Sequence, residues 1–124
     1  MSEILIDHVL LDRVTKAAKE SPRLRMNYNF HESLSSPSQR LLNALEPGTV
    51  LPIHRHRHTA ETYVLLRGRM RVLFYDDDKK EINRYELDPA EGTYGINIPR
   101  GQWHTIEVLC AGTVIFEVKD GPYI

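Results

Sequence analysis

The side chains best suited to chemistry are three histidines and a glutamate in the segment 54–61, together with a histidine further along the chain. His54 and His56 occupy alternate positions, so a strand over 50–56 would place both imidazoles on one face. Glu61 begins the next predicted strand, and His104 follows a turn at 99–101, from which closure of a barrel could bring it close. The spacing predicts a metal site formed by His54, His56, Glu61 and His104. His58 shares the alternation but lies where the chain turns toward Glu61, so it is left out of the ligand set.

This donor set indicates which ions the site would take. Imidazole nitrogens with one carboxylate oxygen suit one divalent transition metal ion, namely Fe, Mn, Ni, Co, Zn or Cu. Calcium and magnesium require more oxygen ligands. Four protein ligands would leave about one or two coordination positions for water, oxygen or a substrate, which is the condition for metal-assisted chemistry.

The elements that must position these residues are mostly strands. Apolar residues at helical spacing predict one amphipathic helix over about 9–20, and Ser21-Pro22 ends the pattern. From Leu24 onward the period is two, with Arg25, Asn27, Asn29 and His31 on the polar side of the first strand. Further strands are predicted at 39–45, 50–56, 61–67, 69–75, 81–87, 94–99, 103–109 and 113–119. The regular turns between them indicate an all-β barrel or sandwich.

Length and composition limit the class of protein. The 124 residues suffice for one domain. With 16 basic and 17 acidic side chains the formal net charge is -1, so a nucleic acid partner is not expected. No apolar run approaches the roughly 20 residues that cross a bilayer, and the N-terminus lacks a secretory signal pattern, which predicts a cytoplasmic protein without a membrane partner. Cys110 is the only cysteine, so no internal disulfide is expected.

The motif around the histidines resembles the first motif of the cupin superfamily. Gly48, five residues, His54-x-His56, four residues, Glu61, six residues and Gly68 match that motif in full. In the second motif Pro99, Gly101 and His104 match, while the leading glycine falls one residue early at Gly92 and Val108 replaces the final asparagine. The resemblance implies a double-stranded β-helix, or jelly-roll barrel, with one short N-terminal helix. It also implies a single cupin domain over 1–124, with an N-terminal strand and helix at about 3–20 and the barrel at about 23–120.

More narrowly, the chain resembles the WbuC family of cupin-fold metalloproteins. The resemblance rests on Asn29-Phe30-His31, Gln39-Arg40, Pro47-Gly48-Thr49, the metal motif, Glu61-Thr62 and the ending Glu117-Val118-Lys119-Asp120-Gly121-Pro122-Tyr123. It implies a bacterial protein encoded with surface polysaccharide genes, without naming a reaction. The candidate substrate-binding residues are Asn29, His31, Arg40, Tyr63 and Tyr123. Solvation of an edge strand explains Asn29 and His31 about as well, and core packing is the more ordinary role for Tyr63.

These expectations leave three functions open. The first is a metal-dependent enzyme, resembling an isomerase or epimerase, that acts on a small polar substrate such as a sugar or sugar nucleotide. The second is an iron-dependent dioxygenase with the same ligands, and the third is a non-catalytic carbohydrate-binding module that contains a metal. A strand at Glu3 to Asp7 could pair across a homodimer, because a barrel edge needs covering.

Overall fold

The computed structural model describes residues 2–122 and begins with one helix. Helix α1 spans His8–Glu20, where the sequence predicts one over about 9–20. The Asp7 side chain caps it by accepting a 3.0 Å hydrogen bond from the backbone N–H of Leu10. Its C-terminal cap is Ser21, whose backbone is extended as expected for a residue that precedes proline. Tyr123, one of the predicted substrate-binding residues, lies outside the described residues.

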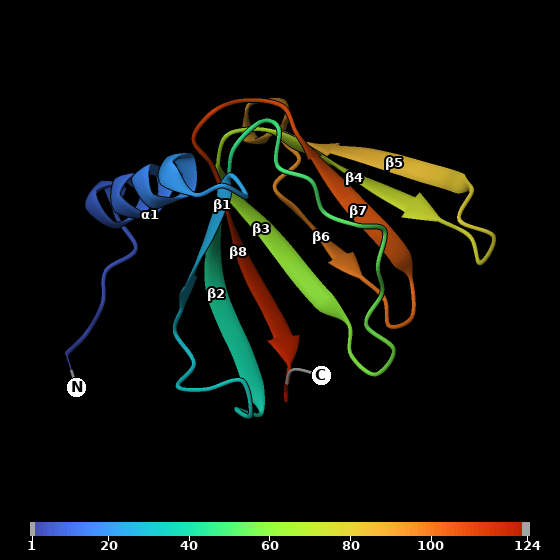
Figure 1. The fold of residues 1–124 in the computed structure, drawn as a ribbon, viewed down its shortest axis with the longest axis horizontal. Coiled ribbons are helices and arrows are strands. Elements are labelled where there is room, and N and C mark those ends of the chain that lie inside the picture. The colour runs from blue at the N-terminus through green and yellow to red at the C-terminus, as the bar shows by residue number, and fades with distance from the viewer. Residues whose placement is uncertain (1, 123–124) are drawn as a thin grey trace.

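The rest of the fold consists of two antiparallel sheets that face each other (Figure 1). The larger sheet has the strand order β1-β2-β8-β3-β6 and the smaller has β5-β4-β7. The strands are β1 Arg25–Asn29, β2 Ser38–Leu45, β3 Glu61–Arg67, β4 Met70–Tyr75, β5 Glu81–Leu87, β6 Gly95–Ile98, β7 Trp103–Val108 and β8 Thr113–Asp120. A short 3-10 helix at Pro89–Glu91 joins β5 to β6. The predicted all-β architecture with one N-terminal helix is confirmed.

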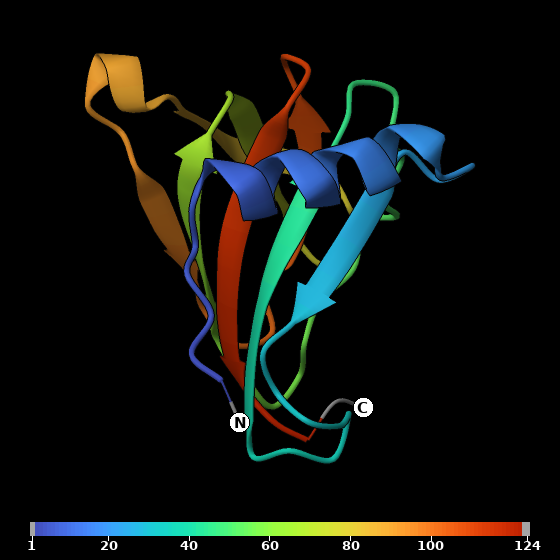
Figure 2. The ribbon, with the colours of Figure 1, turned by 90° about the vertical axis from the view of Figure 1, so that its left-hand side faces the viewer.

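Helix α1 lies across the outer face of the five-stranded sheet (Figure 2). Its buried residues Leu10, Leu11, Val14 and Ala18 form one apolar cluster with residues of β2 and β8, including Leu42. Met26, Tyr28 and Phe30, the apolar side of the first strand, pack against the same cluster. The helix therefore covers one face of the large sheet, and the alternate residues of β1, β2 and β8 must face the barrel interior.

The inner faces of the sheets change from apolar to polar along the barrel axis. A buried apolar cluster between the sheets includes Leu65, Met70, Val72, Val108 and Ile115. Toward the other end polar side chains join the inward positions: Tyr63 and Glu61 precede Leu65 on β3, His104 precedes Ile106 on β7, and Glu117 follows Ile115 on β8. The buried Phe74 and Ile98 lie beside them. One end of the barrel is thus a hydrophobic core, and the other end contains the residues suited to chemistry.

One predicted strand is wrong. Residues 50–56 form no strand and make only an isolated bridge between His54 and His104, because this segment leaves the large sheet after β2 and returns to it at β3, and Pro52 has no N–H to donate. Residues 3–7 pair with no strand of their own chain, where Ile4, Leu5 and Ile6 are largely exposed, so a strand here that pairs across a homodimer stays a prediction. Within residues 2–122, no helix combines the length and apolar character needed to cross a membrane.

Candidate metal centre

The irregular segment before β3 is fastened to the start of β7. The backbone N–H of His54 donates to the carbonyl of His104 at 3.0 Å, and the His104 N–H donates back at 2.8 Å. The Gly101 N–H donates to the carbonyl of His56 at 2.8 Å. These bonds bring residues about fifty positions apart in the sequence into contact, which is how His104 joins the two earlier histidines.

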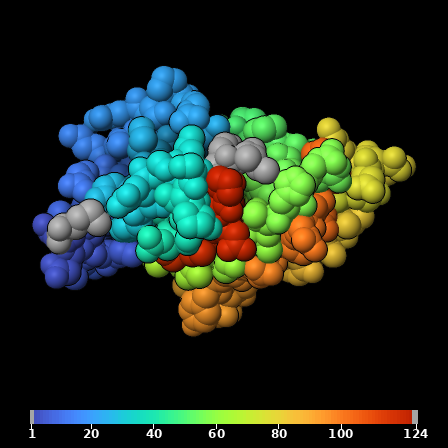
Figure 3. All heavy atoms as spheres, turned by 90° about the horizontal axis from the view of Figure 1, so that it is seen from below, coloured from blue at the N-terminus to red at the C-terminus, as the bar shows by residue number. Residues whose placement is uncertain are grey.

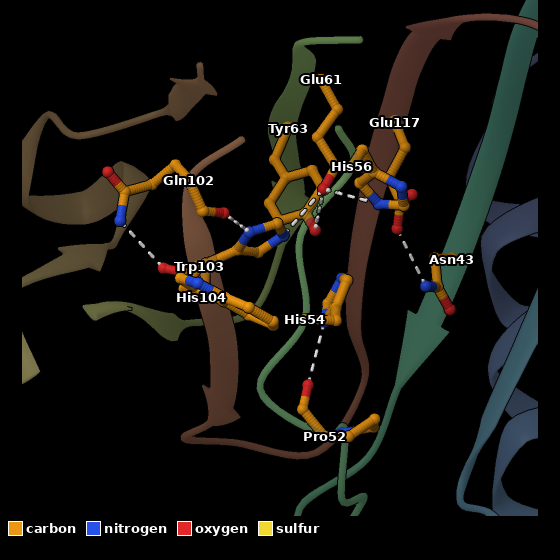
Figure 4. Close-up of polar contacts among 10 residues, drawn as sticks. All are labelled: Asn43, Pro52, His54, His56, Glu61, Tyr63, Gln102, Trp103, His104 and Glu117. Atoms are coloured by element: carbon orange, nitrogen blue, oxygen red, sulfur yellow. Dashed lines mark hydrogen bonds and ion pairs between the residues drawn. The ribbon is translucent and has the colours of Figure 1, made fainter. Parts of the chain in front are cut away.

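The structure gathers all four predicted ligands at the polar end of the barrel (Figure 4). One donor atom from each of His54, His56, Glu61 and His104 lies within 4.8 Å of every other, so the group could hold a metal ion. Glu61 and His104 are almost fully buried, with 3% and 1% of their surface exposed, and they lie at the ends of β3 and β7. His54 and His56 are only half-buried and come from the irregular segment.

Backbone carbonyls orient two of the imidazoles. The Nδ1–H of His54 donates to the carbonyl of Pro52 at 2.9 Å, and the Nδ1–H of His104 donates to the carbonyl of Gln102 at 2.9 Å. With Nδ1 committed to a carbonyl, Nε2 is the nitrogen left to bind a metal, an arrangement typical of metal-binding histidines.

The contact between His104 and Glu61 tests whether a cation fits. His104 Nε2 lies 2.8 Å from Glu61 Oε1, so both ring nitrogens of this imidazole face an acceptor. A neutral imidazole has one proton and can satisfy only one acceptor. A divalent cation held by both Nε2 and the carboxylate would take the place of the missing second proton, so these donors fit the predicted ion.

Electrostatics favour the metal-binding protonation states of Glu61 and His54. Burial by itself raises the pKa of Glu61, but hydrogen bonds from His104 and His56 outweigh it and hold the pKa well below its usual range. Burial lowers the pKa of His54, which favours its neutral form. A carboxylate and neutral imidazoles are the forms that ligate a metal.

Two further ionisable side chains lie next to the group. The hydroxyl of Tyr63 donates to Glu61 Oε1 at 3.1 Å, and burial raises the pKa of Tyr63 well above its ordinary value. Glu117 lies directly opposite Tyr63 on the neighbouring strand and accepts a 2.9 Å hydrogen bond from Asn43 Nδ2. Burial, followed by the charge of Glu61, raises the pKa of Glu117 to about 7.

Some of the candidate substrate residues line a hollow near the metal group, and others do not. Asn29 and His31 line a hollow of about 180 Å³ on the inner face of β1, β2 and β8, together with Glu117. His31 Nδ1 also lies 3.1 Å from the backbone N–H of Arg40, which fixes its ring. The Arg40 side chain is exposed and lies on the outer side of β2, so the structure does not bring it to the site. Tyr63 is buried behind Glu61 and lines neither this hollow nor the one described next.

A second hollow, of about 250 Å³, lies at the mouth of the barrel against the metal group. It is lined by residues 55–59, which include His56 and His58, and by the end of β8. Figure 3 shows this end of the molecule, with the end of β8 in red between the β1–β2 loop and the loop that precedes β3. Lys119 lines both hollows. A larger hollow of about 450 Å³ follows the seam between β5 and β6 and contains none of the four metal-group residues.

Sequence reasoning did not select Asn43, Glu117 or Lys119. A signal for two of them exists, because Ile115, Glu117 and Lys119 alternate on one strand and share its inner face. Ionisable residues are unusual at inward positions of a barrel core, so two of them after the apolar Ile115 could have indicated a functional site.

Comparison with known families gives a first assignment. A family model described as a domain of unknown function, DUF6016, matches residues 6–87. The chain belongs to this family. The DUF6016 match includes His54, His56 and Glu61 and ends before His104. No curated protein sequence matches the chain significantly.

Solved structures show the fold. The capsular polysaccharide assembling protein CapF from Staphylococcus aureus superposes with a TM-score of 0.64 at 22% identity, covering 77% of this chain and 26% of that one. The Cnp3 cupin domain of Schizosaccharomyces pombe gives 0.61 at 11% identity, with 77% and 64% covered. Bacillus subtilis oxalate decarboxylase, which has Mn(II) centres, gives 0.60 at 21% identity, with 81% and 26% covered. The chain spans only part of these relatives, and at these identities they show that it has a cupin fold, as the motif resemblance predicted.

Proposed function

We propose that this protein binds one divalent transition metal ion through His54, His56, Glu61 and His104 and acts as a metal-dependent enzyme on a small polar molecule. The observation that carries the proposal is the convergence of four donor atoms within 4.8 Å beside an open hollow. A group buried for structure alone would need no opening, and structural zinc sites favour cysteine ligands.

The substrate class rests on relatives and on a resemblance. CapF is a capsular polysaccharide assembling protein, and oxalate decarboxylase has Mn(II) centres. The resemblance to the WbuC family points in the same direction. A sugar or sugar nucleotide of bacterial surface polysaccharide metabolism is therefore the proposed substrate, and the metal would be one of Fe, Mn, Ni, Co, Zn or Cu.

The chain's own residues have distinct roles in such a reaction. When bound, the ion would polarise a carbonyl or neighbouring hydroxyl groups of the substrate. Glu117 is the candidate proton acceptor, because its carboxylate lies on the inner face beside the group and a pKa of about 7 suits proton exchange near neutrality. Asn43 orients that carboxylate through Nδ2. A binding module would need no such group, so Glu117 favours an enzyme.

The test combines elemental analysis with a turnover screen. Protein purified without a histidine tag should contain about one metal ion per chain, and His56→Ala should contain almost none. His58→Ala is the matched control, since His58 is exposed, lies two residues away and is not part of the group. Loss of the ion in both variants, or in neither, would contradict the assignment.

Turnover is then measured by NMR on sugars and sugar nucleotides, with metal-loaded and chelator-treated protein. Conversion that depends on the metal and disappears in Glu117→Gln supports the enzyme. Saturable sugar binding by metal-loaded protein without any conversion identifies the binding module instead. Turnover that requires both iron and oxygen identifies the dioxygenase.

A further inference from the structure

Lys119 lies near the proposed metal centre but has no role in the proposed reaction. In the register of the large sheet it lies directly opposite Glu61 on β3 and opposite Gln39 on β2. Residues paired in this way project to the same face, so the ammonium group is on the inner side, next to a proposed metal ligand. It is half-buried and interacts electrostatically with Glu117.

The charges around this lysine favour a negatively charged ligand. Three neutral imidazoles and one carboxylate around a divalent cation leave a net positive centre. The positive charge of Lys119 balances the negative charge of Glu117. The exposed residues Arg57 and Asp120, of opposite charge, both line the same mouth. An anion at the mouth would lie next to His56 of the metal group and to the Lys119 ammonium group.

The neighbouring hollow has a different chemistry. Besides Lys119 and Glu117, its lining includes the amides Asn27, Asn29 and Gln39, which both donate and accept hydrogen bonds. Asn43, on the same inner face and only 9% exposed, has a buried Oδ1 without a hydrogen-bond partner among the described residues. Such an acceptor is satisfied by a hydroxyl group or by water. Both hollows are smaller than the roughly 300 Å³ at which sites for drug-sized ligands begin, so the ligand is small.

We infer that the ligand of this site is a small hydroxylated molecule bearing an oxyanion, either a carboxylate or a phosphate. The oxyanion lies at the mouth between the metal group and Lys119, and the hydroxyl groups extend into the amide-lined hollow. This inference rests on the proposed metal centre and adds the substrate's charge, with Lys119 as the residue that selects it.

The test measures binding rather than turnover. Metal content is determined first, so that absence of the ion in wild type is recognised as failure of the metal centre itself. Glucuronate, glucose 6-phosphate and glucose are then titrated into the metal-loaded protein. Binding is followed by calorimetry and by the fluorescence of Trp103, the only tryptophan, which adjoins His104 in the chain. We expect glucuronate or glucose 6-phosphate to bind about ten-fold or more tightly than glucose, and whichever binds better identifies the oxyanion.

Three variants isolate the role of the lysine. Lys119→Met should lose about ten-fold in affinity for the preferred anion, and far less in its weak affinity for glucose. Lys119→Arg should retain the preference, and Lys80→Met, at an exposed hairpin position, should match wild type. Unfolding temperatures and metal contents near those of wild type confirm that the variants are folded and loaded. Equal affinity for glucose and both anions, no saturable anion binding, or wild-type affinity in Lys119→Met would each overturn the inference.

Discussion

Separate replacement of His104 and His56 by alanine should distinguish metal binding from folding stability. Both variants lose a proposed ligand, so both should be purified with far less metal than wild type. In the metal-free state, however, only the His104→Ala variant should be strongly destabilised. The reason is that the two histidines differ in burial and in their contact with Glu61.

The expected magnitudes follow from these contacts. His104 and Glu61 have side chains 1% and 3% exposed, with 2.8 Å between Nε2 and Oε1. Removing His104 leaves the buried Glu61 carboxylate without this partner, and loss of one partner of such a buried pair costs about 3–5 kcal/mol. The side chain of His56 is 20% exposed, and its Nε2 lies 3.5 Å from the same oxygen, so its removal should cost about 1 kcal/mol or less. For a domain of this size, about 4 °C in Tm corresponds to each kcal/mol.

Calorimetry or circular dichroism in the presence of a chelator provides the assay. His104→Ala should unfold roughly 12–20 °C below wild type, and His56→Ala within about 4 °C of it. Elemental analysis of the same preparations, made without chelator, reports the ion. Equal unfolding temperatures for the two metal-free variants would refute the argument from burial. Full metal content in His56→Ala would refute the ligand assignment.

Three further predictions concern residues around the site. Glu117 has a pKa of about 7 in the folded protein, above its unfolded value, so its stabilising contribution is lost as pH rises from about 4.5 to 7. The free energy of unfolding of metal-free Glu117→Gln, measured in urea, should therefore exceed that of wild type by about 1–3 kcal/mol at pH 8 and by little at pH 4.5. Gly68→Ala should lower the free energy of unfolding by several kcal/mol, because φ is +93° and the new Cβ would lie 2.5 Å from a backbone atom of β8. Gly112→Ala, with φ of +78° and no atom within 4 Å of the new Cβ, should lower it by only about 1–2 kcal/mol. Thermal unfolding of both variants provides the measurement. Arg55→Ala should weaken metal retention about ten-fold against a competing chelator, because the guanidinium packs 4.5 Å from the ring centre of Trp103 and fastens the segment between two ligands.

Periodicity was sufficient to predict the helix, most of the strands and the fold class. Leu10, Leu11, Val14 and Ala18 recur at helical spacing, and this is the face that packs on the large sheet. The metal group was predicted from its motif spacing, but the reason for its proximity lies elsewhere. The backbone bonds between His54 and His104 join segments far apart in the chain, and no local pattern encodes such contacts.

The wrong prediction of a strand at 50–56 has a physical cause in the path of the chain between β2 and β3. The segment 50–56 alternates like a strand, yet it leaves the large sheet between β2 and β3, and its only β-bridge joins His54 to His104. The strand β5 was predicted with its correct bounds, but the sequence did not indicate that it is a sheet edge with residues 81–86 all exposed. Asn29 and His31 differ in this respect: Asn29 is exposed at the end of the edge strand β1, whereas His31 lies beyond that strand and is buried. Both line a hollow, and their contact with a substrate stays a prediction.

The arrangement of the four proposed ligands explains why stability and metal binding should separate. Glu61 and His104 lie on strands whose other inward residues form the apolar core, so folding of the barrel positions them without help from the ion. His54 and His56 lie on a segment outside any strand, held by a few backbone bonds and by the stacking of Arg55 on Trp103. Half of the site is therefore preorganised by the core, and the other half depends on local contacts that an ion would reinforce. Substitutions in the irregular segment should for this reason affect the metal before they affect the fold.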